Sequence, residues 1–258
     1  MTDTYLDVTV EREVAIITLT RPGKLNAMDI ATRVHLAEAI REFGAGKVRG
    51  IVLTGHGRAF SAGEDLAEAP NSDADVREAF ATFNDITRAV LETTVPVIAA
   101  VNGIAVGGAS EITLCCDMRI GTEATEYFQP ENHRGLVISN ASSILLPRLI
   151  GNRALQLILG AQRIDADEAL RIGLIDQIVP ADELIRIAIE LVLAWTPDPQ
   201  ITALHLQLLR PQIDSIEAAF TREDRAAQAA WASGALAEGV SRFWTSKRAL
   251  NAAYEPTK

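Results

Sequence analysis

The sequence predicts an α/β fold in which two short strands and a helix recur along the chain. Apolar runs without a helical stripe, at residues 50–54 and 95–101, are typical of strands that are covered on both faces. Between these two runs, residues 76–91 carry apolar side chains at helical spacing. Strands that alternate with helices in this way indicate a layered α/β core.

A helical C-terminal region is expected to follow this core. The clearest internal boundary is TPDP at residues 196–199, because two prolines within four residues interrupt any regular element. Beyond it, residues 201–253 are rich in alanine and show helical patterns with no strand signal. We therefore expect a core with the functional site at residues 1–196 and a helical region at residues 197–258.

Local patterns place the other elements. Residues 8–20 alternate around a charged turn and predict a β-hairpin. Residues 26–42 predict a helix with Asp29 near its start, where a carboxylate suits the helix dipole. Asp165 and Gly173 are the expected N-cap and C-cap of a later helix. The remaining expected elements are short strands at residues 118–120, 127–128 and 175–179, and helices after Ser143, at 154–159 and at 182–195.

Composition argues against several classes of protein. The chain has 258 residues, 48% of them hydrophobic, so it can bury a sizeable core. Its formal net charge of −10 argues against a general nucleic-acid or anionic-membrane partner. The N-terminus lacks a basic segment followed by an apolar one, and no uncharged apolar run reaches the roughly 18 residues of a membrane span. Cys115 and Cys116 are adjacent on a predicted helix and cannot easily bridge each other, so we expect buried free thiols in a cytoplasmic protein.

The chain is organised around VPVIAAVNGIAVGGASEITLCCD at residues 95–117. A strand is followed by Gly107 and Gly108, which allow a close approach of backbone to a ligand, and then by a helix. The first N–H groups of that helix lack acceptors within it, so an oxygen that acquires negative charge is stabilised there. Glu111 lies about one turn into the helix, beside such an oxygen. The loop GHGRAFSAGEDLAEA at residues 55–69 has a similar layout, and we expect both turns to face one pocket.

Glu111 and Glu131 are the candidates for acid/base chemistry. Taken alone, each is more often a solvated surface acid. Their neighbours are apolar on one side and glycines on the other, which indicates partial desolvation and suits proton transfer near neutral pH.

Other chemistries have weaker support. There is no glycine fingerprint of dinucleotide-binding or P-loop type, and GGASE lacks the closing glycine of a serine-hydrolase elbow, so Ser61 and Ser110 are weak nucleophile candidates. The four histidines show no pair at metal-ligand spacing, so we expect no metal site. His133 is the one histidine expected to line a pocket near Glu131, and a surface loop position is its alternative.

Six ordered motifs run through most of residues 5–180. They are RPGKLNAM at 21–28, GRAFSAGEDL at 57–66, VPVIAAVNGIAVGGASEITLCCDMRI at 95–120, FQPE at 128–131, LPRLIG at 146–151 and RIDADEALRIGLIDQIVP at 163–180. No single motif is decisive, but the ordered set is highly specific. With this set the chain resembles the enoyl-CoA hydratase/isomerase (crotonase) family.

The resemblance implies a crotonase-like spiral of strand-strand-helix turns, with a C-terminal helical region used in trimer formation and often a dimer of trimers. It implies an acyl-CoA thioester as substrate, so coenzyme A is part of the substrate and no separate cofactor is expected. By position, the two backbone N–H groups of an oxyanion hole fall on Glu64 and Gly108, and the two carboxylates of the hydratases fall on Glu111 and Glu131. Substrate contacts are implied for Lys24, Ala62, Gly63, Asp65, Leu66, His133, Ser139 and Lys247.

The chemistry of thioesters explains why such groups are needed. Adding water next to a thioester moves charge onto the carbonyl oxygen, and two N–H donors stabilise the resulting enolate. One carboxylate takes a proton from the water that attacks C3 while the other supplies a proton at C2. Isomerases of the family generally manage with one carboxylate, so the presence of both favours hydration.

The chain departs from the family pattern beside this site. After Gly135 the family usually has a proline and a glycine-rich turn, whereas this chain has ISNASS at residues 138–143. In hydratases the first glycine of that turn offers its N–H to the catalytic water, and Ser139 stands there in this chain. Its side chain and that of Asn140 add polar groups near the acyl pocket, and His133 and Arg134 stand where the family commonly has apolar residues. A polar or cyclic acyl group, or a modified reaction such as hydration coupled to C–C cleavage, is therefore a plausible alternative. At Glu64 the family uses only the backbone, so we expect that side chain to point away.

The phosphates of CoA require cations in spite of the acidic total. The candidates are Lys24, in a loop whose family counterpart lies near the nucleotide, and Lys247 or Arg248 in the C-terminal helix. For each, a solvated surface position is the alternative.

Three functions remain open on the sequence alone. The first is a 2-enoyl-CoA hydratase, favoured by the paired carboxylates. The second is another reaction of the family, namely double-bond isomerisation, thioester hydrolysis or C–C cleavage, favoured by residues 139–143. The third is a non-catalytic acyl-CoA binder, disfavoured by the two intact carboxylates and the two intact glycine turns.

Overall fold

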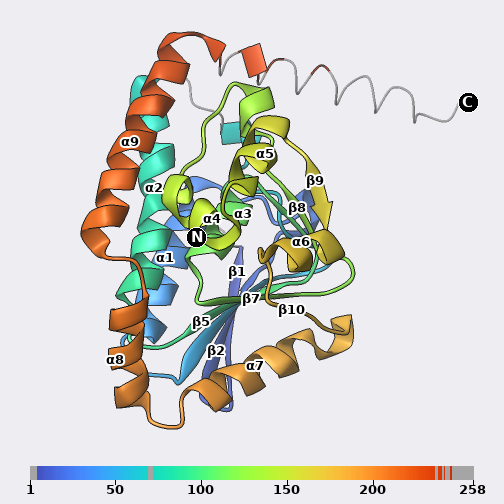
Figure 1. Cartoon of the computed structure of the whole chain (residues 1–258), viewed down its shortest axis with the longest axis vertical. Helices are drawn as coiled ribbons and strands as arrows, with labels where there is room; N and C mark the ends of the chain where they lie inside the picture. Colours follow the sequence, from blue (N-terminus) through green and yellow to red (C-terminus); the bar gives the residue numbers. More distant parts are fainter. Residues whose placement is uncertain (1–4, 69–71, 236–237, 240, 242–244, 246–258) are drawn as a thin grey trace, which may run out of the picture.

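The computed structural model of this chain contains two β-sheets with helices packed around them, and it describes residues 5–68, 72–235, 238–239, 241 and 245 (Figure 1). The strand order is β1-β2-β3-β5-β7-β10 in the larger sheet and β4-β6-β8-β9 in the smaller one. The larger sheet consists of β1 (Leu6–Glu11), β2 (Val14–Leu19), β3 (Gly50–Gly55), β5 (Val97–Val101), β7 (Met118–Gly121) and β10 (Gln177–Ile178). The smaller sheet consists of β4 (Ala59–Ser61), β6 (Ile104–Val106), β8 (Glu126–Phe128) and β9 (Arg163–Asp165).

Helices lie between the strands and after the last of them. The α-helices are α1 (Ile30–Gly44), α2 (Asp73–Glu92), α3 (Gly108–Cys115), α4 (Ser142–Ile150), α5 (Arg153–Gly160), α6 (Ala166–Ile172), α7 (Leu184–Trp195), α8 (Pro199–Leu209) and α9 (Ile213–Ala232). Short 3₁₀ helices are η1 (Pro22–Lys24), η2 (Leu66–Glu68), η3 (Glu131–Arg134) and η4 (Ala181–Glu183).

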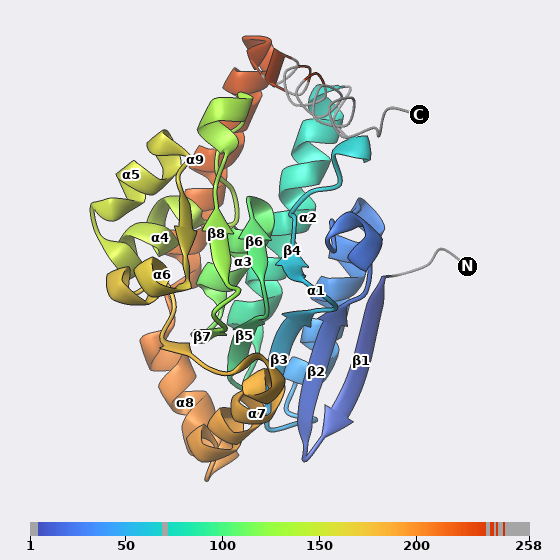
Figure 2. The same ribbon diagram turned by 90° about the vertical axis from the view of Figure 1, so that its right-hand side faces the viewer.

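From β3 to β8, consecutive strands alternate between the two sheets. β3, β5 and β7 pair in parallel in the larger sheet, and β4, β6 and β8 pair in parallel in the smaller one. Figure 2 shows β8, β6 and β4 above β7, β5 and β3 in the same order. A helix follows each pair of strands, with α2 after β3 and β4, α3 after β5 and β6, and η3 and α4 after β7 and β8. The expected spiral of strand-strand-helix turns is thereby confirmed.

The local predictions hold for most elements. β1 and β2 form the expected antiparallel hairpin, Asp165 and Gly173 cap α6 as expected, and Cys115 and Cys116 are buried and free. Strands β4, β6 and β9 were not predicted, and β4 lies in the stretch expected to be a loop, because three residues are too few to show an alternating pattern.

The helix expected at residues 26–42 begins later, at Ile30. Asn26 has a left-handed φ of 57°, and its side-chain amide donates to the carbonyls of Ala59 and Phe60, which hold it in the preceding loop. Asp29, expected near the helix start, is the N-cap. The side-chain chemistry of Asn26 therefore outweighs the helical spacing of the apolar residues that follow it.

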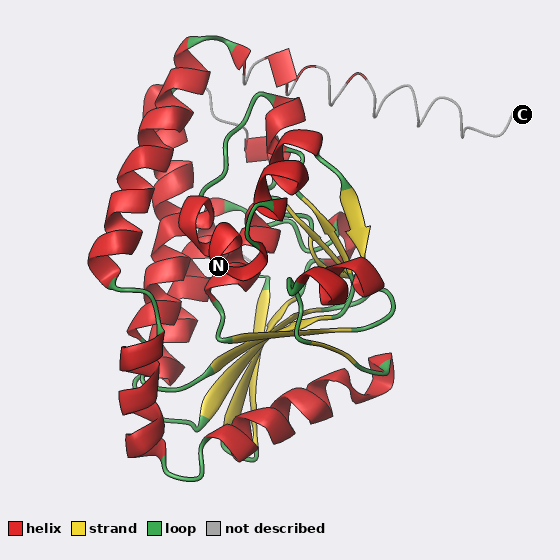
Figure 3. Ribbon diagram, viewed as in Figure 1, coloured by secondary structure: helices red, strands yellow, loops and turns green. Residues whose placement is uncertain are grey.

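The larger sheet is covered on both faces. α7 crosses one face (Figures 1 and 3), where Ala188 and Val192 pack with Val52 and Ile98. The other face contributes to the main core, which α1, α2, α3 and α4 also line. Every residue of β5 is buried, as expected for a strand with both faces covered. This burial fixes the position of the glycine turn and of α3, which follow β5.

The C-terminal helices share this core. α9 runs beside α2 (Figure 3), and its Ile216, Ala219 and Phe220 belong to the main core. Residues after 196 thus pack directly on elements that precede that boundary. Within the described residues, no helix combines the length and apolar character that crossing a membrane requires.

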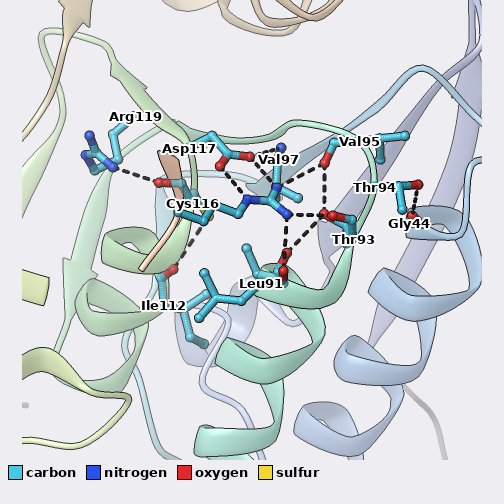
Figure 4. A network of polar contacts seen from close by, with 12 residues as sticks. Gly44, Leu91, Thr93, Thr94, Val95, Val97, Ile112, Cys116, Asp117 and Arg119 are labelled. Atoms are coloured by element: carbon cyan, nitrogen blue, oxygen red, sulfur yellow. Dashed lines mark hydrogen bonds and ion pairs between the residues drawn. The ribbon is translucent and has the colours of Figure 1, made fainter. Parts of the chain in front are cut away.

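An ion pair ties the C-terminal helices to the central stretch. Arg210, between α8 and α9, donates to both carboxylate oxygens of Asp117, at 2.8 and 2.6 Å. The same guanidinium donates to the carbonyls of Thr93 and Val95, and the Val97 N–H donates to Asp117 (Figure 4). Removing one partner of such a buried, fully hydrogen-bonded pair is strongly destabilising. The pair therefore holds the start of β5 next to the end of α3.

Candidate active site

A cavity of about 520 Å³ opens at the start of α3. It is bounded by the loop after β4, by α2, by the first turn of α3, and by η3 with the residues that follow it. Its apolar walls come from Ala79, Phe80, Phe83, Leu136 and Val137. Both candidate carboxylates and both glycine turns border the same cavity.

Two glycine turns meet at one wall of this cavity. Gly63 has a φ of +84°, and a Cβ there would lie 2.5 Å from the Val106 carbonyl oxygen and 3.5 Å from the Gly108 nitrogen. Gly108 begins α3, so its N–H is one of the four that a helix leaves without an acceptor of its own. Only a residue without a Cβ permits this close approach. The structure therefore brings Glu64 and Gly108, the expected oxyanion-hole positions, to one wall.

Glu111 is buried at this wall, with 1% of its surface exposed. The Ser139 N–H donates to both carboxylate oxygens, at 3.0 and 3.2 Å, and the Ser139 hydroxyl donates to Oε2 at 2.6 Å. The side-chain amide of Asn140 also donates to Oε2, at 3.1 Å. Burial, and next the charge of Glu131, raise the pKa of Glu111 well above its ordinary value, and the hydrogen bonds only partly oppose this.

Glu131 is the first residue of η3 and is 7% exposed. Its Oε1 lies against Gly107, where an added Cβ would come within 2.8 Å. Among the described residues, none forms a hydrogen bond with its Oε2. Burial raises the pKa of Glu131 to about 7, against the opposing effects of its own backbone N–H and of Arg134. Two carboxyl groups with raised pKa values at one wall can divide the roles of acid and base near neutral pH.

The turn at residues 139–143 is held by side chains from α2 and α9. Asn140 and Ala141 each have a φ of 59°, which costs a residue with a Cβ about 1–2 kcal/mol. Glu223 of α9 accepts the Ala141 N–H at 2.9 Å and a second N–H two residues later at 2.8 Å. Asn84 of α2 accepts the Asn140 N–H at 3.2 Å. These contacts stabilise the strained turn that presents donors to Glu111.

The sequence patterns did not mark Glu223 or Asn84 as part of this site. Glu223 belongs to the charged run TRED, which has the pattern of a solvated helix face, yet it is 4% exposed. The one sequence feature that could have pointed to them is that each lies within a helix whose apolar residues line the core.

Lys24 borders the cavity but is already paired. Its ammonium lies 3.0 Å from Asp65 Oδ2, which also accepts from Arg21 at 2.6 Å. Burial alone would raise the pKa of Asp65, but hydrogen bonds from the Ala67 N–H, Lys24 and Arg21 leave it below its ordinary value. The other expected contact residues that line the cavity are Ala62, Leu66 and Ser139.

Among the described residues, two expected contacts do not line the cavity, namely Gly63, whose neighbours Ala62 and Glu64 do, and His133. His133 is exposed and does not line it, so the prediction that His133 borders the pocket is wrong and the surface alternative holds. Lys247, with its alternative Arg248, lies outside the described residues.

Three arginines that were not proposed as contacts line the cavity, namely Arg58, Arg134 and Arg163. The guanidinium groups of Arg134 and Arg163 lie 6.0 and 4.7 Å from the centre of the Phe128 ring. Their position follows from the fold, because Arg163 starts β9, which pairs with β8. Among the described residues, no group of three or more His, Cys, Asp or Glu side chains is placed to hold a metal ion.

Comparisons with known proteins agree with this geometry. The model of a family described as enoyl-CoA hydratase/isomerase matches residues 9–250. A crotonyl-CoA hydratase of Syntrophomonas wolfei is 36% identical over 178 residues, or 67% of this chain and 68% of that protein. A short-chain-enoyl-CoA hydratase of Clostridium acetobutylicum is 39% identical over 170 residues, or 64% of this chain and 65% of that protein. The crystal structure of an enoyl-CoA hydratase from Mycobacterium avium subsp. paratuberculosis K-10 has a TM-score of 0.83 and 27% identity, over 93% of this chain and 96% of that one.

Proposed function

Because the chain belongs to the enoyl-CoA hydratase/isomerase family, we propose that it adds water across the C2=C3 double bond of a 2-enoyl-CoA thioester. The observation that carries the proposal is the pair Glu111 and Glu131, both buried at one cavity wall and close enough for one charge to affect the other. The names of the relatives from S. wolfei and C. acetobutylicum support a short acyl chain.

In the proposed reaction the thioester carbonyl oxygen lies at the wall formed by the two glycine turns. Attack of water at C3 moves an electron pair through C2 onto this oxygen, and the N–H groups of Glu64 and Gly108 stabilise the enolate. One carboxylate of the pair removes a proton from the attacking water, and the other carboxyl delivers a proton to C2. The pair therefore works in the state that holds one proton, and coenzyme A enters only as part of the substrate.

The direct test is the loss of enoyl-thioester absorbance when the purified protein is mixed with crotonyl-CoA. We expect rapid loss, with 3-hydroxybutyryl-CoA as the product in mass spectrometry. Protein that binds CoA thioesters but leaves every enoyl-CoA of short or medium length unchanged would disprove the proposal.

The pH dependence of kcat/KM is expected to be bell-shaped. At low pH both carboxyl groups are protonated and no base is present. Because burial raises both pKa values, that of Glu131 to about 7, activity should rise as the pH increases toward neutral. Activity falls again at higher pH, when the second proton of the pair is lost. A profile from pH 5 to 10 measures both limbs, and a rate that is flat between pH 6 and 8 would contradict the proposed division of roles.

The cations of the cavity are expected to act on the CoA part of the substrate. Lys24→Ala and Arg58→Ala each remove a positive charge that is exposed or half-exposed. An ion pair between such a charge and a CoA phosphate contributes about 1 kcal/mol or less to binding, so KM for crotonyl-CoA should rise by up to about fivefold with kcat unchanged. The increase should shrink at high salt. Crotonyl-pantetheine, which lacks the nucleotide, is the control, and an equal increase in its KM would show that the two residues act elsewhere.

A second candidate function rests on Ser139. Its N–H, which by family resemblance would bind the catalytic water, donates to Glu111 in this structure. This arrangement favours another reaction of the family on an acyl-CoA, in which Glu111 acts without that water. A mass-spectrometric survey of products from short, aromatic and cyclic acyl-CoAs separates the two candidates, because isomerisation conserves mass, hydration adds one water, and hydrolysis or C–C cleavage releases a fragment.

We further propose a homotrimer or homohexamer in the cytoplasm. Self-association is supported by exposed apolar side chains along α8, at Ile201, Leu204, Leu208 and Leu209. Such a row is costly to leave in water and suits contact with another copy.

A further inference from the structure

Arg33 is an arginine with none of its surface exposed. It is the fourth residue of α1, at the end of the first turn, where a hydrophobic residue is usual for a position that faces the core. A buried guanidinium is costly unless it is paired and hydrogen-bonded. The groups that contact the guanidinium of Arg33 therefore indicate the role of its positive charge.

One partner of Arg33 is the side chain of Glu64. The guanidinium Nη1 lies 3.7 Å from Glu64 Oε1, and the same atom donates to the Ala79 carbonyl of α2 at 3.2 Å. The backbone at Glu64 is also joined to the segment that leads into α1, because the Met28 N–H donates to the Gly63 carbonyl at 2.8 Å. The Glu64 segment and the start of α1 thus form one unit, held by backbone and side-chain contacts.

The second partner is the ring of Phe83. The Arg33 guanidinium lies 4.5 Å from the centre of this ring, within the range of a cation–π contact. Atoms of the same ring would lie 2.7 Å from a Cβ placed on Gly108. Arg33 therefore contacts a group next to each of the two proposed N–H donors. It contacts the carboxylate of Glu64 itself and the Phe83 ring, which packs on Gly108.

The charge of Glu64 makes this arrangement more than a packing contact. In the proposed function the Glu64 N–H stabilises a carbonyl oxygen that becomes negative, and the Glu64 side chain is itself negative. An uncompensated carboxylate on the same residue would repel that oxygen in a site with little water. An arginine next to the carboxylate offsets this repulsion and fixes the position of the side chain.

We propose that Arg33 is a positioning residue of the oxyanion hole, which neutralises the Glu64 carboxylate and holds the Glu64 turn and Phe83 in place. The inference rests on the proposed function, since it assigns Arg33 to the stabilisation of the same enolate. It predicts an asymmetry between the two partners. Loss of Arg33 leaves a negative charge beside the hole, whereas loss of the Glu64 charge does not.

The test uses three variants of the full chain: Arg33→Met, Glu64→Gln and the double variant. For crotonyl-CoA we expect kcat to fall at least about tenfold in R33M, with KM nearly unchanged, as for partial loss of an oxyanion-hole donor. E64Q keeps the backbone N–H and should lower kcat less than R33M does. The double variant should recover most of the activity lost in R33M, because a neutral pair of similar volume replaces the ion pair. If Arg33 only stabilises the fold, the double variant will be no more active than R33M, and the inference is wrong.

Arg88→Met is the matched control. Arg88 also pairs with a glutamate, Glu217, at 2.5 Å and lies 4.7 Å from the centre of a phenylalanine ring, Phe220, but it does not line the cavity. This variant should keep its kcat. If R33M does not fold, R33Q replaces it, because Gln also lacks the charge but can still donate to the Ala79 carbonyl. A kcat of R33Q equal to that of the original chain would overturn the proposal.

A second readout separates this inference from the proposed function. The infrared stretching frequency of bound butyryl-CoA, labelled with ¹³C at the thioester carbonyl, reports hydrogen bonding to that oxygen without turnover. The original chain and E64Q should shift the band to lower frequency than in water, and R33M should shift it less. A full shift in R33M overturns the role of Arg33 even if the original chain hydrates crotonyl-CoA. If that chain leaves enoyl-CoA unchanged, the proposed function fails, while the carbonyl band still decides the role of Arg33.

Discussion

Glu111→Gln and Glu131→Gln should each lower kcat for the hydration of crotonyl-CoA by about 10²- to 10⁴-fold, the usual contribution of a positioned acid or base. Gln keeps the size of the side chain but can neither accept nor release a proton at this pH. Both carboxyl groups are buried at one wall of the cavity, so solvent cannot easily replace either one. Single-turnover absorbance measurements separate this loss from any change in binding.

The matched control is Glu168→Gln, since Glu168 lies on the exposed surface of α6 and pairs there with Arg171. This variant should retain full activity. A Gln variant of either cavity residue that is as active as the control would remove the basis for assigning hydration to the pair.

Gly63→Ala should cost about 10²- to 10³-fold in kcat, the effect of losing one oxyanion-hole donor. The new Cβ would lie 2.5 Å from the Val106 carbonyl oxygen, so the Glu64 turn must move away from the start of α3. The positive φ of 84° adds a strain of about 1–2 kcal/mol. Steady-state kinetics and a thermal unfolding curve distinguish the two effects.

Gly173→Ala provides the comparison for strain alone. Gly173 has nearly the same φ, +83°, at the end of α6, and an added Cβ there comes no closer than 3.6 Å to its nearest neighbour. Both variants should lose similar stability from strain, while only Gly63→Ala loses activity. Equal activity of the two would mean that the Glu64 N–H does not contribute to the reaction.

Much of the fold could be predicted from patterns that span a whole element. The apolar run that became β5 has no helical period, and Asp165 and Gly173 are the cap residues that a short helix prefers. Glu111 could be placed for the same reason, because its distance from Gly108 along a helix fixes which wall it occupies. Where one side chain decided the outcome the prediction was wrong, as at Asn26, whose amide keeps the loop from becoming helix.

The residues that support the site could not be predicted in this way. Glu223 and Arg33 have the sequence surroundings of ordinary surface helix residues, and their burial depends on which helix packs against them. For His133 the prediction placed a residue at the cavity that the structure leaves on the surface. Nearness in sequence to Glu131 did not bring its side chain to the cavity. Periodic patterns report which face of an element is buried, but they do not report which charged residue on that face finds a partner from a distant segment.

The capping of the 139–143 turn by Glu223 bears on how this protein can be recombined with its relatives. A chimaeric chain joined anywhere between Ser143 and Glu223 would take the turn from one parent and its capping carboxylate from the other. A parent with a glycine-rich turn has less strain to offset there, whereas Asn140 and Ala141 need the carboxylate to hold their left-handed conformation. Crossover points before residue 139 or after residue 223 keep the two together, and gene libraries built from this sequence should inherit the turn and α9 from the same parent.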